Sequence, residues 1–130
     1  EATDASHEMS FYQIEGLMVG SDISLANFKY IIEEFLKKFF GSNIEFRYRP
    51  SYFPFVEPGL EVDIKFKGKW LEMMGAGMVH RNVFKAVRYD PSKVQGFAFG
   101  LGFVRFAMVK YNIPDIRLFY SGDLRFVEQF

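Results

Sequence analysis

The run from Arg49 to Gly59 limits most strongly what this chain can fold into, because it holds prolines at positions 50, 54 and 58. Proline fixes φ, donates no backbone hydrogen bond and holds the residue before it extended. The run is therefore expected to be stiff and non-helical. Phe53 and Phe55 lie between these prolines. We expect them either to form a preformed aromatic wall for a flat apolar ligand or to belong to a rigid turn facing the core.

Hydrophobic spacing predicts a mixed order of strands and helices along the chain. The strand at residues 11–19 is expected to be buried on one face, and the helix at 25–39 to begin at Asp22 or Ser24 and to end at Gly41. A hairpin is expected at the Lys67-Gly68 turn. This order indicates an α+β fold with a largely antiparallel sheet. The other expected strands are residues 44–49, 60–66, 70–74 and 96–102, and the other expected helical segments are 79–88, 103–110, 115–119 and 123–130.

Composition narrows the class of protein. A length of 130 residues fits one domain, and most of the 17 phenylalanines are expected in its core. The 16 basic and 16 acidic residues cancel, which argues against a stand-alone nucleic-acid-binding module but leaves a local basic patch open. Without cysteine, and with His7 and His80 far apart, a structural zinc site is not expected. No run of the sequence reads as a membrane span or signal peptide, so we expect a soluble cytoplasmic protein.

Two features suggest ligand binding. Gln13 and Glu15 leave the same face of their strand, where they either bind an ammonium or ribose hydroxyl or form a solvated sheet face. Arg105 lies in the first turn of a helix, where a cation costs about 0.3–1 kcal/mol. That cost suggests anion binding beside the free backbone N–H groups, the alternative being an ordinary surface arginine.

Several blocks of sequence resemble bacterial phenylalanyl-tRNA synthetase alpha subunits, in the order and spacing of that family and over nearly all of the chain. The blocks are Asp4-Ala5-Ser6-His7-Glu8, Phe11-Tyr12-Gln13-Ile14-Glu15-Gly16, Phe53-Pro54-Phe55-Val56-Glu57-Pro58-Gly59, Gly77-Met78-Val79-His80, Gly96-Phe97-Ala98-Phe99-Gly100-Leu101-Gly102 and Ile113-Pro114-Asp115-Ile116-Arg117. The resemblance implies a class II synthetase catalytic fold, truncated, in which residues 1–130 form a single partial catalytic domain from the end of motif 2 through motif 3.

The resemblance also implies a reaction and its site. Phenylalanine and ATP, with Mg²⁺, would form phenylalanyl-adenylate, and the acyl group would pass to tRNA(Phe). The residues implied to act on ATP are Glu1 at the end of motif 2, His7 at the phosphates, Phe11 under the adenine and Arg105 of motif 3 at the triphosphate. Those implied to bind phenylalanine are Gln13 and Glu15 at the ammonium, Phe53 and Phe55 at the ring, and Val56, Ala98 and Gly100 at the pocket floor. Glu57 is similar to a magnesium ligand that the family shares with a beta subunit in an α2β2 assembly.

The sequence departs from the family in several places. Motif 1 and the motif 2 arginine are absent, Val104 replaces an acidic residue, and Arg81 replaces a proline. The opening residues Glu1 to Asp4 read like the middle of an element, so an upstream segment is expected. Two hypotheses follow: a fragment of a synthetase with reduced or no activity of its own, or a non-catalytic module that binds phenylalanine or adenylate. A structural domain with no ligand is a third.

Overall fold

The structure is a computed structural model that describes residues 3–130, and two compact units make up the chain. One unit comprises the residues up to Ile14 together with Gly102–Phe130, and the other is Glu15–Leu101. The described chain contains no helix long and apolar enough to span a membrane.

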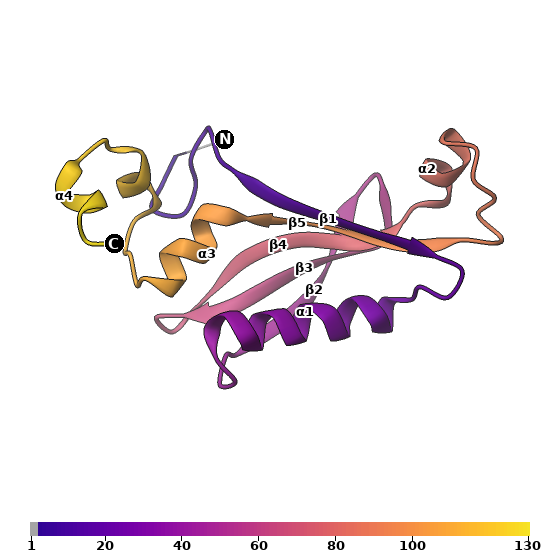
Figure 1. Ribbon diagram of the computed structural model, residues 1–130, viewed down its shortest axis with the longest axis horizontal. Helices are drawn as coiled ribbons and strands as arrows, with labels where there is room; N and C mark the ends of the chain where they lie inside the picture. The colour runs from indigo at the N-terminus through magenta and orange to yellow at the C-terminus, as the bar shows by residue number, and fades with distance from the viewer. Residues whose placement is uncertain (1–2) are drawn as a thin grey trace. The chain divides into compact units, whose positions relative to one another are not determined.

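The sheet has five strands in the order β1-β5-β4-β3-β2 (Figure 1). Each of the pairs β2–β3, β3–β4 and β4–β5 is antiparallel, which confirms the predicted sheet type. At the predicted hairpin Lys67 and Gly68 both have positive φ, as two-residue hairpin turns require. The strands are β1 (Gln13–Gly20), β2 (Phe46–Phe53), β3 (Val56–Phe66), β4 (Lys69–Val79) and β5 (Gln95–Gly102).

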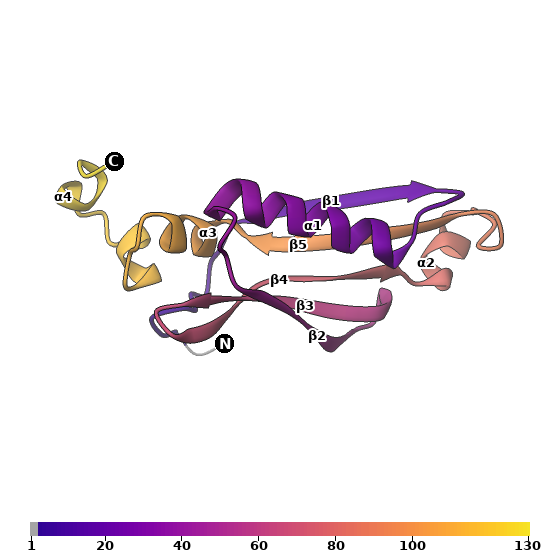
Figure 2. The ribbon, with the colours of Figure 1, turned by 90° about the horizontal axis from the view of Figure 1, so that it is seen from below.

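Helix α1 (Leu25–Phe40) covers one face of the sheet in the Glu15–Leu101 unit, as Figures 1 and 2 show. Of the two predicted caps, Ser24 is the N-cap: it accepts a hydrogen bond from the backbone of Asn27, and the helix ends before Gly41 as predicted. The fully buried ring of Phe28 lies 5.4 Å from the ring of Phe97 in β5. Apolar side chains of the helix and of the covered face form the core of this unit, including Ile32, Leu36, Val62, Ile64 and Met74.

The prediction that residues 11–19 are buried on one face is wrong. In β1 only Gly16 and Gly20 are partly covered, and the side chains of Leu17 and Met18 are exposed. The physical reason is that β1 is an edge strand of the sheet, with a neighbour on one side only. The alternation was read correctly as a strand, but it does not reveal which face is covered.

Shorter helices complete the two units. In the Glu15–Leu101 unit, α2 (Arg81–Ala86) is shorter than the predicted 79–88 because Val79 still belongs to β4 and His80 is the N-cap. In the other unit, α3 (Phe103–Lys110) starts where predicted, followed by the 3₁₀ helix η1 (Ile116–Tyr120) and α4 (Leu124–Val127). The N-cap of η1 is Asp115 and the N-cap of α4 is Asp123, which confirms the predicted acidic caps. The carbonyl of Ala5 accepts a 2.9 Å hydrogen bond from Ile116, which ties the two segments of this unit together.

Candidate active site

On the sheet face opposite α1, small residues of three adjacent strands lie side by side. Gly77 of β4 pairs with Gly59 of β3 and with Ala98 of β5, and Gly75 of β4 pairs with Gly100 of β5. Paired residues in adjacent strands extend to the same face of a sheet. The result is a floor of backbone and one methyl group, which we call the glycine floor. Glycines at these positions let neighbouring side chains come close to the backbone: Phe53 lies against Gly75, and Val56 lies against Gly77.

The ring of Phe53, at the end of β2, forms one side of the glycine floor. A Cβ atom built at Gly75 would lie 2.9 Å from Cζ of Phe53, so the ring rests on the backbone of that glycine. Phe53 is half-buried, and its neighbour Phe55 is 57% exposed. The two rings are stacked, with centroids 6.0 Å apart and planes inclined by 24°. The prolines therefore do not fold these rings into a core-facing turn, the alternative that the sequence had left open.

The backbone around Phe55 is held by the neighbouring strand. The carbonyl of Phe55 accepts a 2.9 Å hydrogen bond from the backbone of His80, directly after β4. Two rings 6.0 Å apart leave no space for a third ring between them, because each stacked pair needs centroids at least about 4.5 Å apart. A ligand ring would thus meet the Phe53 and Phe55 pair from its open side.

Val56 borders the same floor from β3. Its side chain is 3% exposed and lies 2.7 Å from a Cβ atom built at Gly77, the residue paired with Ala98. Four of the residues expected to line a phenylalanine pocket therefore meet around Gly75 and Gly77. They are Phe53, Val56, Ala98 and Gly100.

Strand β1 adds a carboxylate on this side of the sheet. Gly16 lies against the ring of Phe99, which is on the opposite face from Ala98 and Gly100 because strand side chains alternate. Its neighbour Glu15 therefore leaves β1 on the face of the glycine floor, and it is exposed. Within β1, Gln13 is two residues from Glu15 and leaves the same side of the strand.

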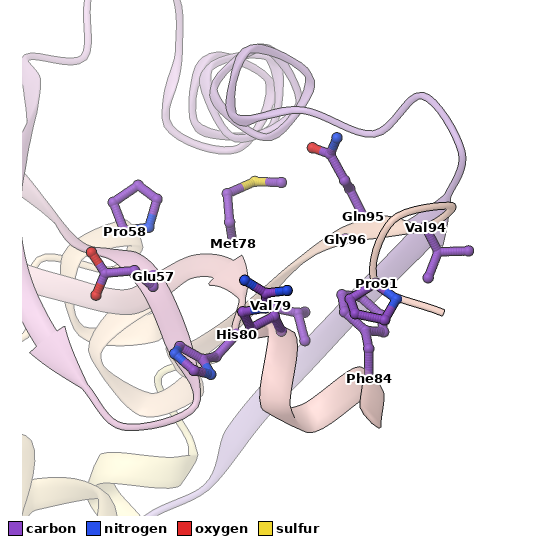
Figure 3. A pocket seen from close by; sticks show the side chains of 11 residues that line it. Glu57, Pro58, Met78, Val79, His80, Phe84, Pro91, Val94, Gln95 and Gly96 are labelled. Carbon is purple, nitrogen blue, oxygen red and sulfur yellow. The ribbon is translucent and has the colours of Figure 1, made fainter. Parts of the chain in front are cut away.

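A hollow of about 370 Å³ opens near Glu57, with Glu57 and Pro58 on one side and Phe84, Pro91 and Val94 on the other (Figure 3). Its lining also includes Met78 and Gln95, which belong to the face covered by α1. Of the predicted site residues, only Glu57 lines it. None of the floor residues Gly59, Gly75, Gly77, Ala98 and Gly100 lines this hollow, so it is distinct from the glycine floor.

Glu57 is exposed, and within residues 3–130 no three His, Asp or Glu side chains gather as metal ligands. Mg²⁺ in nucleotide sites is commonly bound by one or two carboxylates together with phosphate oxygens and water. A single accessible carboxylate is compatible with that arrangement. Glu57 therefore fits as one ligand of a magnesium ion.

The unit that contains Gly102–Phe130 brings two predicted nucleotide-binding residues close together. Arg105 in α3 donates from Nε to the carbonyl oxygen of Ser6 at 3.0 Å, although the two residues are 99 positions apart. His7 follows Ser6 directly, and its Nδ1 lies 2.9 Å from a carboxylate oxygen of Asp4. Hydrogen bonds from the backbone of Ser6 and from His7 hold the pKa of Asp4 far below its usual value. The loop at His7 is therefore fixed by Asp4 and joined to the start of α3.

The remaining predicted nucleotide-binding residues lie at the N-terminal end of the chain. Phe11 is 54% exposed, so its ring is accessible for stacking. Tyr12, next to it, accepts a 3.0 Å hydrogen bond from the backbone of Phe103 at the start of α3. Glu1 lies outside the described residues. Val104, which the resemblance implies to replace an acidic residue, is 7% exposed and packs as part of the core.

A charged cluster beside the glycine floor was missed by the sequence reasoning. Arg47 and Arg49 of β2 both donate to Asp63 of β3, and Arg49 also pairs with Glu61, whose partner across the sheet is Gly75. The signal was present in the sequence: basic residues two apart in one strand and acidic residues two apart in the next. Their exact pairing depends on the register of β2 and β3, which the pattern alone does not fix.

Comparison with known proteins agrees with this geometry. The family model described as tRNA synthetases class II core domain (F) matches residues 1–130. The phenylalanine–tRNA ligase alpha subunit of Rickettsia felis is 54% identical over 131 residues, which cover 98% of this chain and 38% of that protein. The corresponding subunit of Rhodopirellula baltica is 52% identical over 130 residues, covering 100% of this chain and 38% of that protein. The chain thus spans less than half the length of these curated relatives.

A solved structure supports the same fold at much lower sequence identity. The pyrrolysyl-tRNA synthetase from Desulfitobacterium hafniense superposes with a TM-score of 0.59 at 16% identity, covering 95% of this chain and 42% of that one. At this identity the likeness concerns the fold alone. The antiparallel sheet flanked by helices and the family match over residues 1–130 lead to one conclusion. The chain belongs to the family of class II tRNA synthetase core domains.

Proposed function

We propose that this chain is part of the catalytic domain of a phenylalanine–tRNA ligase, from the end of motif 2 through motif 3. The enzyme joins phenylalanine to ATP, releases pyrophosphate and transfers the phenylalanyl group from the adenylate to tRNA(Phe). The observation that carries the proposal is that Phe53, Val56, Ala98 and Gly100 meet around Gly75 and Gly77, next to the exposed ring of Phe55, and form an apolar surface. Relatives at 52–54% identity are named for this same reaction.

Phenylalanine binds on the glycine floor in this proposal. Its ring meets Phe53 and Phe55 edge to face, which contributes about 0.5–1.5 kcal/mol per pair beyond burial. Val56, Ala98 and Gly100 limit the depth of the pocket, and the methyl group of Ala98, which pairs with Gly77, lies under the far end of the ring. Glu15 and Gln13 hold the ammonium group by charge and by hydrogen bonding.

ATP is bound by the residues around the start of α3. Arg105 neutralises the triphosphate, His7 contacts the phosphates, the ring of Phe11 stacks on adenine, and Glu1 contacts the nucleotide from motif 2. The guanidinium of Arg105 stabilises charge that develops as the carboxylate oxygen attacks the α-phosphorus. Mg²⁺, held in part by Glu57, supplies further neutralisation of the phosphates when bound.

The assembly belongs to the same proposal. The relatives are named as alpha subunits, which implies a beta subunit, and we infer an α2β2 enzyme that acts in the cytoplasm. A wholly apolar pocket rejects the extra hydroxyl of tyrosine by only about 10²-fold in comparable cases, so discrimination at this site is modest.

Pyrophosphate exchange with the full-length subunit, assembled with its partner, tests the proposal. Exchange that depends on phenylalanine and exceeds that with tyrosine, leucine and methionine is the expected result. Calorimetric titration with phenylalanine and with ATP distinguishes the enzyme from the alternative, a non-catalytic module that binds phenylalanine or adenylate. Binding of phenylalanine without any exchange would establish a binding module, and a lack of both would reject the proposed function.

A further inference from the structure

The backbone pairing between β2 and β3 is weak next to Phe53. Strand β2 is an edge strand, so its backbone is paired on one side only. Pro50 has no N–H to donate to the ladder, and the register of β2 against β3 shifts between Ser51 and Phe53. Hydrogen bonds between the two strands therefore do not by themselves fix where the Phe53 ring lies over Gly75.

Side chains tie the strands together just before this irregularity. Asp63, whose side chain is 3% exposed, accepts bonds from Nε of Arg47 at 2.8 Å and from Nε of Arg49 at 2.9 Å. Arg49 reaches on to Glu61, and the other carboxylate oxygen of Glu61 accepts a 2.7 Å bond from the hydroxyl of Ser51. The side chain of Glu61 is 17% exposed, so water competes little for these bonds.

We propose that Glu61, held by Arg49, is a positioning residue that fixes Ser51 and through it the ring of Phe53 against Gly75. The inference rests on the proposed function, because the ring matters as the wall of a phenylalanine pocket. Ser51 is two residues before Phe53 on the same strand, so a displacement of Ser51 moves the base of the ring. Glu61 itself pairs with Gly75 across β3 and β4, which links the network to the floor as well as to the wall.

The electrostatics make this network a fixed unit at neutral pH. Burial alone would raise the pKa of the Asp63 carboxyl, but hydrogen bonds from Arg49 and Arg47 outweigh burial and keep that pKa below its usual value. The pKa of Arg49 is raised, mainly by its hydrogen bond to Asp63. The ion pair between Asp63 and Arg49 is therefore charged at neutral pH. Removing Glu61 leaves Arg49 bound to Asp63 but releases the hydroxyl of Ser51.

Steady-state pyrophosphate exchange with the full-length assembled enzyme tests the role of Glu61. Glu61→Ala should raise the KM for phenylalanine about tenfold, the effect of losing about 1.4 kcal/mol of ring contact, while the KM for ATP and kcat change by less than about threefold. Ser51→Ala should act in the same direction. The double variant should be no worse than Glu61→Ala alone, because both changes break one connection.

Two further variants separate positioning from a general loss of structure. Glu61→Gln keeps an oxygen acceptor for Ser51, so it should restore the phenylalanine KM to within about threefold of the wild type. Lys65→Ala removes the 2.9 Å ion pair between Lys65 of β3 and Glu45, the residue before β2, and should leave that KM unchanged. An unchanged phenylalanine KM in Glu61→Ala, with only a lower melting temperature, would overturn the inference. Absence of phenylalanine-dependent exchange in the wild type would instead reject the proposed function on which it rests.

Discussion

The ring of Phe53 rests on the backbone of Gly75, so closely that a Cβ atom at Gly75 would lie 2.9 Å from Cζ of the ring. Real Cβ contacts are never this short, so any side chain at position 75 must displace the ring. The space that this glycine leaves is thus occupied by the residue that we propose as the wall of the phenylalanine pocket.

Gly75→Ala should therefore weaken phenylalanine binding. The ring is the far end of a side chain and has room to tilt, so the fold should survive, with an overpacking cost near the lower end of about 1–3 kcal/mol. We expect the KM for phenylalanine in pyrophosphate exchange to rise about tenfold and the KM for ATP to stay the same.

Gly77→Ala, two residues along the same strand, is the matched control. A Cβ atom there would lie 2.4 Å from the backbone oxygen of Pro58 and 2.7 Å from Cβ of Val56. Backbone atoms cannot tilt aside, so this variant should lose stability, by about 2 kcal/mol or more, and show a lower melting temperature. If Gly75→Ala shows the same loss of stability with an unchanged phenylalanine KM, the ring is a packing element rather than a pocket wall.

Ala98→Gly should enlarge the pocket. Ala98 contributes the one methyl group of the glycine floor, opposite Gly77, and removing it opens a space of about one carbon atom. We expect the full-length enzyme to activate para-substituted phenylalanines at least about tenfold better relative to phenylalanine, measured as the ratio of kcat/KM values in pyrophosphate exchange.

Ala76→Gly provides the comparison for this variant. Ala76 is also a small residue in the middle of the sheet, but it pairs with Phe99 on the face covered by α1. Glycine in a strand interior costs about 0.5–1 kcal/mol, so stability should fall slightly while substrate preference stays unchanged. Equal substrate preference in both variants would exclude Ala98 as part of the pocket floor.

The sequence predicted the elements well because local signals were strong. The Lys67-Gly68 turn, the Ser24 cap and the Asp115 and Asp123 caps are each decided by residues within a few positions of one another. The stiff aromatic segment around Phe53 was also predictable, because a proline restricts the backbone conformation of itself and of the residue before it.

Relations across strands were not predictable in the same way. The glycine floor exists because Gly75 and Gly77 pair with Gly100 and Ala98, and one residue of slip would move these glycines to the other face. The ion pairs of Asp63 depend on another register, that of β2 against β3. The exposure of β1 depends on which strand lies at the edge of the sheet, which is a property of the whole sheet rather than of residues 11–19.

Arg105→Ala should impair the use of ATP more than the binding of phenylalanine. In our proposal its guanidinium neutralises the triphosphate, and the loss of one preorganised donor of this kind costs about 10²–10³ in rate. We expect kcat/KM for ATP to fall about 100-fold, and the affinity for phenylalanine, measured by calorimetry, to change by less than about threefold.

Arg125→Ala is the control for loss of one arginine in the same unit. Its side chain is 89% exposed and pairs with Asp123, the N-cap of α4, so its removal should leave the binding of both substrates unaffected. Because Arg105 also donates to the carbonyl of Ser6, a purely structural role predicts a different outcome. In that case kcat/KM for ATP and the affinity for phenylalanine would fall to the same extent, and the melting temperature of the protein would be lower.

The stability of the folded protein should depend on pH because of the Asp63 carboxyl group. Its pKa is lower in the folded protein than in the unfolded chain, where an aspartate titrates near 3.9. A lowered folded pKa means that the carboxylate stabilises the fold fully above about pH 4, and that this contribution is lost as the pH falls through the folded pKa. Asp63→Asn should therefore destabilise the protein at pH 7, and the difference from the wild type should shrink below about pH 4.

The size of that difference follows from the exposure of the partners. Asp63 is buried, but the side chains of Arg47 and Arg49 are 42% and 45% exposed, so water screens the pairs. We expect about 1–2 kcal/mol at pH 7 from urea midpoints, less than the 3–5 kcal/mol typical of breaking a fully buried pair. Glu45→Gln, which changes a carboxylate that is 63% exposed and directly precedes β2, should alter stability by less than about 0.5 kcal/mol at either pH. A difference for Asp63→Asn that stays constant from pH 7 to pH 3 would mean that the arginines stabilise the fold without help from the charge of Asp63.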